Sequence, residues 1–101
     1  MAEDQRKCWL IAEYLKVSFV GCSVLYDYDD RELVARSYRI VDDFTGKLRH
    51  YVVVCRAFLE DHAEAAIVPA LEQLAFLACL TLAGVRRVTV RSRMIDIEAA
   101  A

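Results

Sequence analysis

Apolar and polar residues alternate along the first half of the chain in a pattern typical of β-strands. The run VSFVGCSVLY begins at Val17, is rich in β-branched and aromatic residues, and ends at a polar cluster that opens with Asp27. The run LVARSYRIV follows at residues 33–41 and alternates between two faces. One face carries Val34, Tyr38 and Ile40, with Arg36 among them. These runs predict the first two strands of a sheet.

A third strand is predicted at LRHYVVVC, residues 48–55. The polar segment 42–47 before it indicates a hairpin connection, in which Gly46 is available for a positive φ angle. Residues 52–54 are all valine, so this strand is apolar on both faces, as expected for a central, covered strand. Three consecutive strands with short connections predict an antiparallel meander.

The period of the pattern changes near Leu59, where the chain is expected to turn helical. Asp61 and Glu64 have the spacing of a capping pair, in which each side chain binds an unpaired backbone N–H of the first helical turn. Pro69 lacks an N–H, and its ring clashes with the preceding turn of a regular helix. We therefore expect a short helix, a break near residues 67–68, and a second helix that begins at Pro69.

This main helix is predicted to run from Pro69 to Ala83 and to stop at Gly84. One of its faces has the spacing of a stripe packed on a core, at Leu71, Leu74, Ala75, Ala78 and Leu82. The opposite face carries Phe76, Leu77 and Leu80. Leaving a large apolar side chain in water forgoes about 1.5–3 kcal/mol of burial, so these three residues require a cover.

The sequence leaves three candidates for the segment or molecule that covers this apolar face. The favoured one is a second copy of the chain, because a two-fold axis lets one apolar surface bury itself. The second is the N-terminal segment 5–16, which periodicity assigns equally well to a helix or to a strand. The third is a different partner or an apolar ligand. We therefore predict a homo-oligomer, with a dimer favoured and with Phe76, Leu77 and Leu80 at its interface.

The run VRRVTVRSRMI predicts one final strand with a basic face. Its basic residues are Arg86, Arg87, Arg91 and Arg93. Arginine binds phosphate bidentately, which makes this face a candidate site for an anion or a nucleic acid. The structural alternative is a solvated strand that lies opposite acidic side chains on its neighbours. No aromatic residue occurs between residues 85 and 101 to stack on bases, which favours this alternative.

Composition adds constraints on the class of protein. The hydrophobic share is 57%, above the roughly 45–50% of ordinary soluble domains. The formal net charge of −2 argues against a surface that attracts nucleic acid or anionic lipid as a whole. The four cysteines lack paired spacing and are expected to be small buried thiols of a cytoplasmic protein. No run reaches the 18–20 or so apolar residues of a membrane span, and we expect no secretory signal.

Other groups of reactive residue types lack the pattern of a site. The acidic cluster of Asp27, Asp29, Asp30 and Glu32 lacks the glycine and distal glutamate of a calcium loop, and a solvated turn is expected. The capping pair accounts for two of the four candidate metal ligands at residues 60–64. The sequence contains no glycine-rich phosphate loop, serine elbow or His-Glu-x-x-His motif. We therefore expect no catalytic residues, no cofactor and no metal.

The segment VVCRAFLEDH, residues 53–62, resembles the strand-to-helix junction of a family of small bacterial domains of unknown function. In that family a strand runs into a serine-arginine-glutamate start, followed by a leucine-glutamate-aspartate helix, a second helix and a closing strand. The resemblance covers residues 33–95, with Cys55 at the position of the capping serine and Ala57 at that of the glutamate. It implies a small antiparallel sheet with helices on one side, and no function.

Together these patterns predict a single α+β domain over residues 1–101. We expect a three- to four-stranded antiparallel sheet, a meander plus a C-terminal strand, with one main helix and a short helix packed on one face. The predicted function is a non-catalytic, homo-oligomeric binding or adaptor module. The alternatives are a nucleic-acid or anion binder that uses the arginine face, and a binder of an apolar small molecule between helix and sheet.

Overall fold

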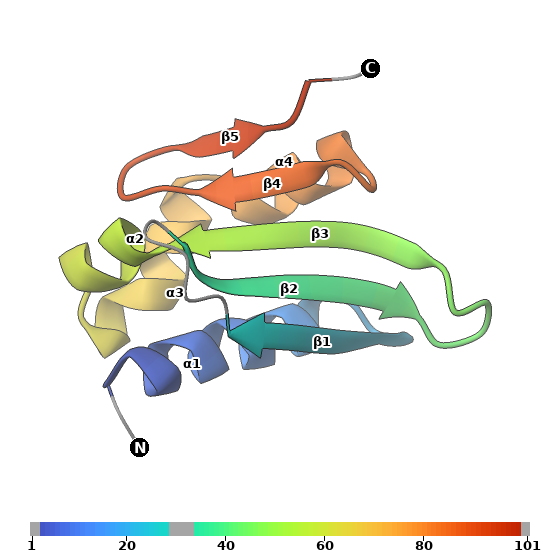
Figure 1. The fold of residues 1–101 in the computed structure, drawn as a ribbon, viewed down its shortest axis with the longest axis horizontal. Helices are drawn as coiled ribbons and strands as arrows, with labels where there is room; N and C mark the ends of the chain where they lie inside the picture. The colour runs from blue at the N-terminus through green and yellow to red at the C-terminus, as the bar shows by residue number, and fades with distance from the viewer. Residues whose placement is uncertain (1–2, 29–33, 100–101) are drawn as a thin grey trace.

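Four helices lie on one face of a five-stranded sheet in the computed structural model, which describes residues 3–28 and 34–99 (Figure 1). The helices are α1 (Glu3–Ser18), α2 (Arg56–Asp61), α3 (Glu64–Gln73) and α4 (Phe76–Ala83). The strands are β1 (Cys22–Tyr28), β2 (Val34–Asp42), β3 (Leu48–Cys55), β4 (Arg87–Val90) and β5 (Ile95–Ile97). The α+β class is confirmed, but the sheet has more strands and the helical layer more helices than predicted.

Strands β1, β2 and β3 form the predicted antiparallel meander. Their register pairs Val24 with Ile40 and Tyr38 with Val52, and all four side chains are buried under the helices. The connection between β2 and β3 is the predicted hairpin, and Gly46 adopts a φ of 71° there. Strand order along the sheet follows chain order, from β1 to β5.

The N-terminal segment, which periodicity left undecided, forms helix α1. Its buried residues recur with helical spacing at Cys8, Ile11, Ala12 and Leu15. Tyr38 Oη donates a hydrogen bond to the Cys8 carbonyl at 2.8 Å, and Lys7 Nζ donates to the Leu59 carbonyl at 2.6 Å. These bonds join α1 to the sheet and to α2. Because α1 continues to Ser18, the first strand begins at Cys22 rather than at Val17 as predicted.

The C-terminal run differs from the single antiparallel strand that was predicted. Strand β4 ends at Val90 and pairs with β3 in parallel, with Val52 opposite Val88 and Val54 opposite Val90. The helical segment between β3 and β4 carries the chain back to the starting end of β3, which makes a parallel pairing possible. A turn closed by the bond from Arg91 N–H to the Met94 carbonyl then leads into β5. The sheet is therefore mixed.

The helical region breaks later than predicted. Pro69 lies inside α3, where it removes one backbone hydrogen bond, and the break falls at Ala75, whose φ and ψ of 55° and 44° are left-handed. The axes of α3 and α4 differ by 54° as a result. The expected capping pair is absent, because Asp61 ends α2 and Ala63 is the N-cap of α3. Gly84, with a φ of 62°, ends α4 as predicted.

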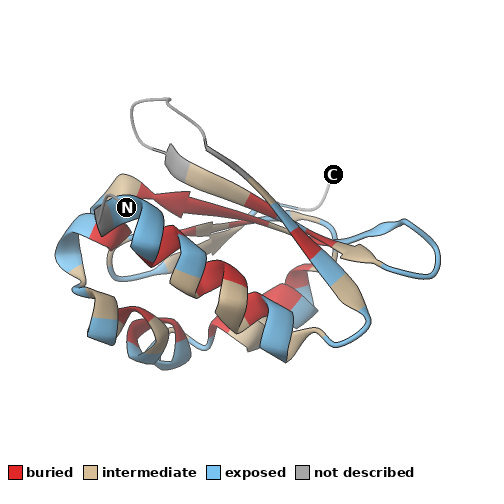
Figure 2. Ribbon diagram, turned by 90° about the horizontal axis from the view of Figure 1, so that it is seen from below, coloured by how far each residue is buried: buried red, intermediate tan, exposed pale blue. Residues whose placement is uncertain are grey.

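One face of the sheet carries the helices, and the described residues place no helix on the other (Figure 2). The register puts Leu25, Arg39 and Tyr51 side by side on this open face, with Val53 beside Thr89 on the same side. No single described helix is long and apolar enough to cross a membrane, and α3 with α4 meets that criterion only as a bent pair.

Candidate functional site

The residues predicted at an oligomer interface lie mostly inside the chain. Phe76 and Leu80 are fully buried, and Leu77 is half-buried. Conversely, Leu82 was predicted to be in the core and is 72% exposed. The prediction treated residues 69–83 as one helix, but the left-handed Ala75 changes the phase of the helical stripe between α3 and α4. The assignment of Phe76 and Leu80 to an exposed face is therefore wrong, whereas Leu77 stays partly exposed.

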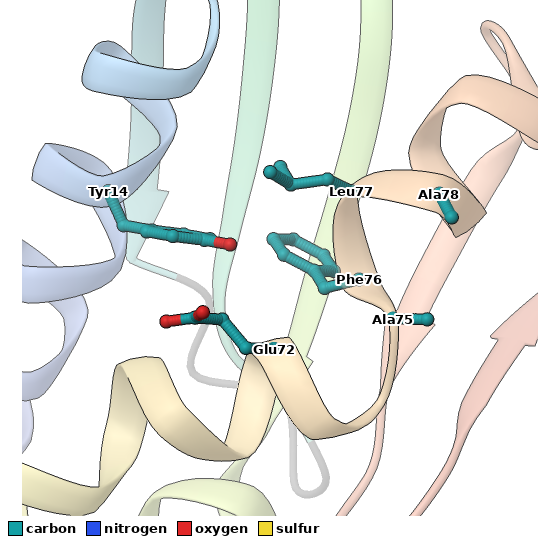
Figure 3. Close-up of a pocket in the computed structure, with 6 residues that line it drawn as sticks. All are labelled: Tyr14, Glu72, Ala75, Phe76, Leu77 and Ala78. Carbon is teal, nitrogen blue, oxygen red and sulfur yellow. The ribbon is translucent and has the colours of Figure 1, made fainter.

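Helix α1 provides the cover that the buried residues require. The ring of Tyr14 stacks on the ring of Phe76, with centroids 6.5 Å apart and an interplanar angle of 24° (Figure 3). Of the three covers considered, the N-terminal segment is thus the one found over Phe76. A cavity of about 230 Å³ remains at the break between α3 and α4, lined by Tyr14, Glu72, Ala75, Phe76, Leu77 and Ala78. Partial burial, followed by the nearby Glu72 charge, raises the pKa of Tyr14, so its phenol stays protonated at neutral pH.

The four arginines predicted as a basic face do not share one strand. Only Arg87 belongs to β4, and Arg91 and Arg93 lie in the turn before β5. Arg86 donates to the carbonyls of Ala83 and Leu82 and so caps the C-terminus of α4.

Acidic residues from the C-terminal strand and its continuation pair with two of these arginines. Arg87 Nη2 lies 4.0 Å from Glu98 Oε2, and Arg91 donates a charge-assisted hydrogen bond to Asp96. This arrangement agrees with the structural alternative, in which the arginines lie opposite acidic neighbours.

Arg93 lines a small cavity of about 170 Å³ with His62, Gln73 and Ser92. The last turns of α2 and α3 border it, and helix C-termini carry partial negative charge. Ser92 donates its hydroxyl hydrogen to the Asp61 carboxylate. These surroundings stabilise the positive charge of Arg93 and disfavour an added anion.

Exposed apolar residues belong instead mostly to segments at one end of the sheet, the end that carries the β2–β3 hairpin, which is on the right in Figure 1. At this end β1, β3 and β4 begin and β2 ends. Nine large apolar side chains are exposed in the described part of the chain, and six belong to segments at this end. They are Val17, Val20, Phe44, Leu48, Leu82 and Val85. We call these six residues the apolar end.

A cavity of about 450 Å³ opens between α4 and β3 at the apolar end. It is lined by Phe19, Leu48, Arg49, His50, Thr81, Gly84 and Val85. His50 Nδ1 donates to the Gly84 carbonyl at 3.1 Å, and its ring lies against Phe19 with centroids 4.9 Å apart. Burial lowers the pKa of His50, so its ring is neutral at pH 7 and Arg49 is the one charged side chain among the described lining residues.

The hairpin between β2 and β3 presents Phe44 at the apolar end on an ordered turn. The backbone N–H groups of Phe44 and Thr45 donate to Asp42 Oδ1 at 2.8 and 3.0 Å. These two bonds lower the pKa of Asp42, because they stabilise its charged form. The Asp43 N–H donates to the Gly21 carbonyl at 3.0 Å and ties the hairpin to the turn after α1. Phe44 is nevertheless 98% exposed.

The open face of the sheet exposes less apolar surface to water than the apolar end does. Val53, at its centre, is only 7% exposed because neighbouring side chains on the sheet surround it. Its one exposed large apolar residue among those described is Leu25, and Arg39 lies directly beside it. The apolar end is therefore the stronger candidate for a contact surface.

The reactive side chains among the described residues include two buried free thiols. Burial raises the pKa of Cys8 and Cys55, which keeps both protonated at neutral pH. Among residues 3–28 and 34–99, no group of three metal-ligating side chains is found. Most of the predicted acidic turn, at residues 29–33, lies outside the described residues.

Comparisons with protein-family profiles, with curated protein sequences and with solved structures return no significant match. The resemblance of residues 53–62 to a family of small bacterial domains therefore stays a prediction. The candidate contact surface rests on the structure of this chain alone.

Proposed function

We propose that the protein is a non-catalytic binding module that self-associates through its apolar end. The observation that carries this proposal is that six of the nine large apolar side chains found exposed among the described residues belong to segments at one end of the sheet. Solvated apolar groups of this size each forgo about 1.5–3 kcal/mol when fully exposed, and contiguous apolar patches mark contact sites on small proteins. The buried free thiols are consistent with a cytoplasmic location.

The size of the molecule limits the contact that this end can make. The molecule measures 35 × 30 × 26 Å along its principal axes, so the end of its long axis is at most 30 × 26 Å across. A standard specific interface buries about 800 Å² per partner, so a dimer of that kind would use most of this end. A two-fold axis would place each apolar end against its copy.

Sedimentation equilibrium of the native chain and of two charged variants tests this proposal. We expect Val20→Glu, at a residue 92% exposed at the apolar end, to dissociate the dimer, because the dimer would bury the new charge. The matched control is Leu25→Glu on the open face, which should leave the dimer intact. Equal dissociation constants for all three proteins would contradict the proposal.

A second candidate function is the binding of an apolar small molecule between helix and sheet. The specific observation in its favour is the cavity of about 450 Å³ between α4 and β3, within the range of about 300–1,000 Å³ typical of ligand pockets. Mass spectrometry of an organic extract of the purified protein tests it. A stoichiometric apolar compound would support this function, and an empty extract would count against it.

The anion or nucleic-acid alternative has weaker support. Arg86, Arg87 and Arg91 already contact helix carbonyls, Glu98 and Asp96, and these carbonyl and carboxylate oxygens would repel a phosphate.

A further inference from the structure

We propose that Phe44 of each copy inserts into the cavity at the apolar end of the other copy, in a symmetric dimer. This inference rests on the proposed self-association and specifies its geometry. The partner it names is a second copy of this chain, held by an exchange of two phenyl rings.

Phe44 has the properties of an inserting side chain. It is 98% exposed, so its ring is available to another molecule. Its turn is held by hydrogen bonds from Phe44 and Thr45 to Asp42, and by the Lys47 N–H to Thr45 Oγ1 at 3.2 Å. The backbone that carries the ring is therefore held in a defined turn, and little backbone conformational entropy is lost when the ring binds.

The cavity has the properties of an acceptor for an aromatic ring. Its volume of about 450 Å³ exceeds the roughly 150 Å³ apolar cavity that is sufficient to hold benzene. Phe19 and His50 supply aromatic surface in its wall, and aromatic pairs are favourable in offset or edge-to-face arrangements. Leu48 and Val85 add exposed apolar side chains to its lining.

The position of the two parts fits a closed dimer. The hairpin that carries Phe44 leads directly into Leu48 and Arg49, which line the cavity, so ring and cavity lie at the same end of the molecule. A two-fold axis at this end forms both contacts at once. The Phe44 ring of each copy then enters the cavity of the other copy. The end is at most 30 × 26 Å across, so an interface of the standard size, about 800 Å² per partner, would cover most of it and include both contacts.

The test compares Phe44→Ser with Met94→Ser by sedimentation equilibrium. Met94 is also an exposed apolar residue in a turn, but it lies before β5, away from the apolar end, and serves as the control. Loss of two buried aromatic contacts should raise the dimer dissociation constant of Phe44→Ser by about 100-fold or more. Met94→Ser should match the native protein. Circular dichroism verifies that each variant is folded.

A complementation experiment addresses the exchange itself. Thr81 is exposed on α4 and lines the cavity, so Thr81→Trp should block the cavity while leaving Phe44 intact. Each variant alone should be largely monomeric, but a mixture of Phe44→Ser and Thr81→Trp should form heterodimers that retain one phenyl contact. Labelled chains followed by fluorescence anisotropy would detect them.

The outcomes separate this inference from the proposed function. A native dimer that Phe44→Ser leaves unchanged would overturn the phenyl exchange while self-association stands. A native monomer at high concentration would overturn both. A native monomer that carries a stoichiometric apolar compound, lost in Thr81→Trp, would assign the cavity to a small molecule instead.

Discussion

Ala75 decides the course of the helical layer at the scale of a single residue. It is the one non-glycine residue with a positive φ among those described, and it separates α3 from α4. A side chain with a Cβ is disfavoured in this conformation because the Cβ approaches the following carbonyl oxygen. The strain is tolerated because the resulting bend lets Phe76 and Leu80 reach the core.

Ala75→Gly should therefore stabilise the protein. We expect the free energy of unfolding to rise by about 0.5–1 kcal/mol, since relief of left-handed strain exceeds the entropy that glycine gains in the unfolded chain. The matched control is Ala78→Gly, at an exposed position inside α4. This change should lower the free energy of unfolding by about 1 kcal/mol. Urea denaturation measures the free energy of unfolding of both variants. A loss of stability in Ala75→Gly would contradict the strain assigned to this residue.

His50 provides a pH-dependent contribution to stability. Burial lowers its pKa in the folded state below the ordinary value of about 6.5, whereas the unfolded chain keeps that value. Between the folded-state and unfolded-state pKa values of His50, the unfolded state binds more protons than the folded state. The free energy of unfolding therefore falls as pH drops below about 6.5.

We expect the urea midpoint to decrease from pH 7 to pH 5.5 in the native protein and to change less in His50→Gln. An imidazole that titrates by NMR at or above 6.5 in the folded protein would contradict this explanation.

Helix α4 shows, at the scale of the element, where sequence patterns succeed and where they fail. The third strand, the hairpin with Gly46 and the stop at Gly84 follow from local composition and were predicted. The break at Ala75 carries no local signal, because alanine is a strong helix former and proline six residues earlier is the conspicuous breaker. One residue of left-handed backbone was enough to exchange the buried and exposed faces of α4.

The reversed faces of α4 lead to a direct prediction for two leucines two residues apart. Leu80→Glu places a charge in the core beside Phe76 and should cost about 3–5 kcal/mol or more, a large part of the net stability of a small domain. Leu82→Glu, at a residue 72% exposed, should change the stability of the isolated chain by less than about 0.5 kcal/mol while weakening self-association. Thermal denaturation at low protein concentration compares the melting temperatures of the two variants. Equal melting temperatures for the two variants would contradict the placement of α4.

The basic C-terminal run could be predicted as strand but not as a hairpin. Arg91 to Met94 lack glycine and proline, so nothing local indicates the turn that separates β4 from β5. The pairing of Arg87 with Glu98 and of Arg91 with Asp96 depends on that turn.

At the scale of the whole molecule, the apolar end is assembled from three separate parts of the chain. The bond from the Asp43 N–H to the Gly21 carbonyl joins the β2–β3 hairpin to the turn after α1, and the parallel pairing of β4 with β3 brings the end of α4 to the same end of the sheet. No window of the sequence contains this surface. The self-association predicted from the second apolar face of residues 69–83 was therefore assigned to Phe76, Leu77 and Leu80, and the exposed apolar residues could be located only from the topology.

The central claim is that two copies bury this end against each other, and the absolute mass of the native chain in solution tests it most directly. Light scattering over a series of protein concentrations should give a mass that approaches twice the 11.5 kDa of the chain as concentration rises. A mass that stays at 11.5 kDa up to the highest concentration would contradict self-association and leave the apolar end to a different ligand.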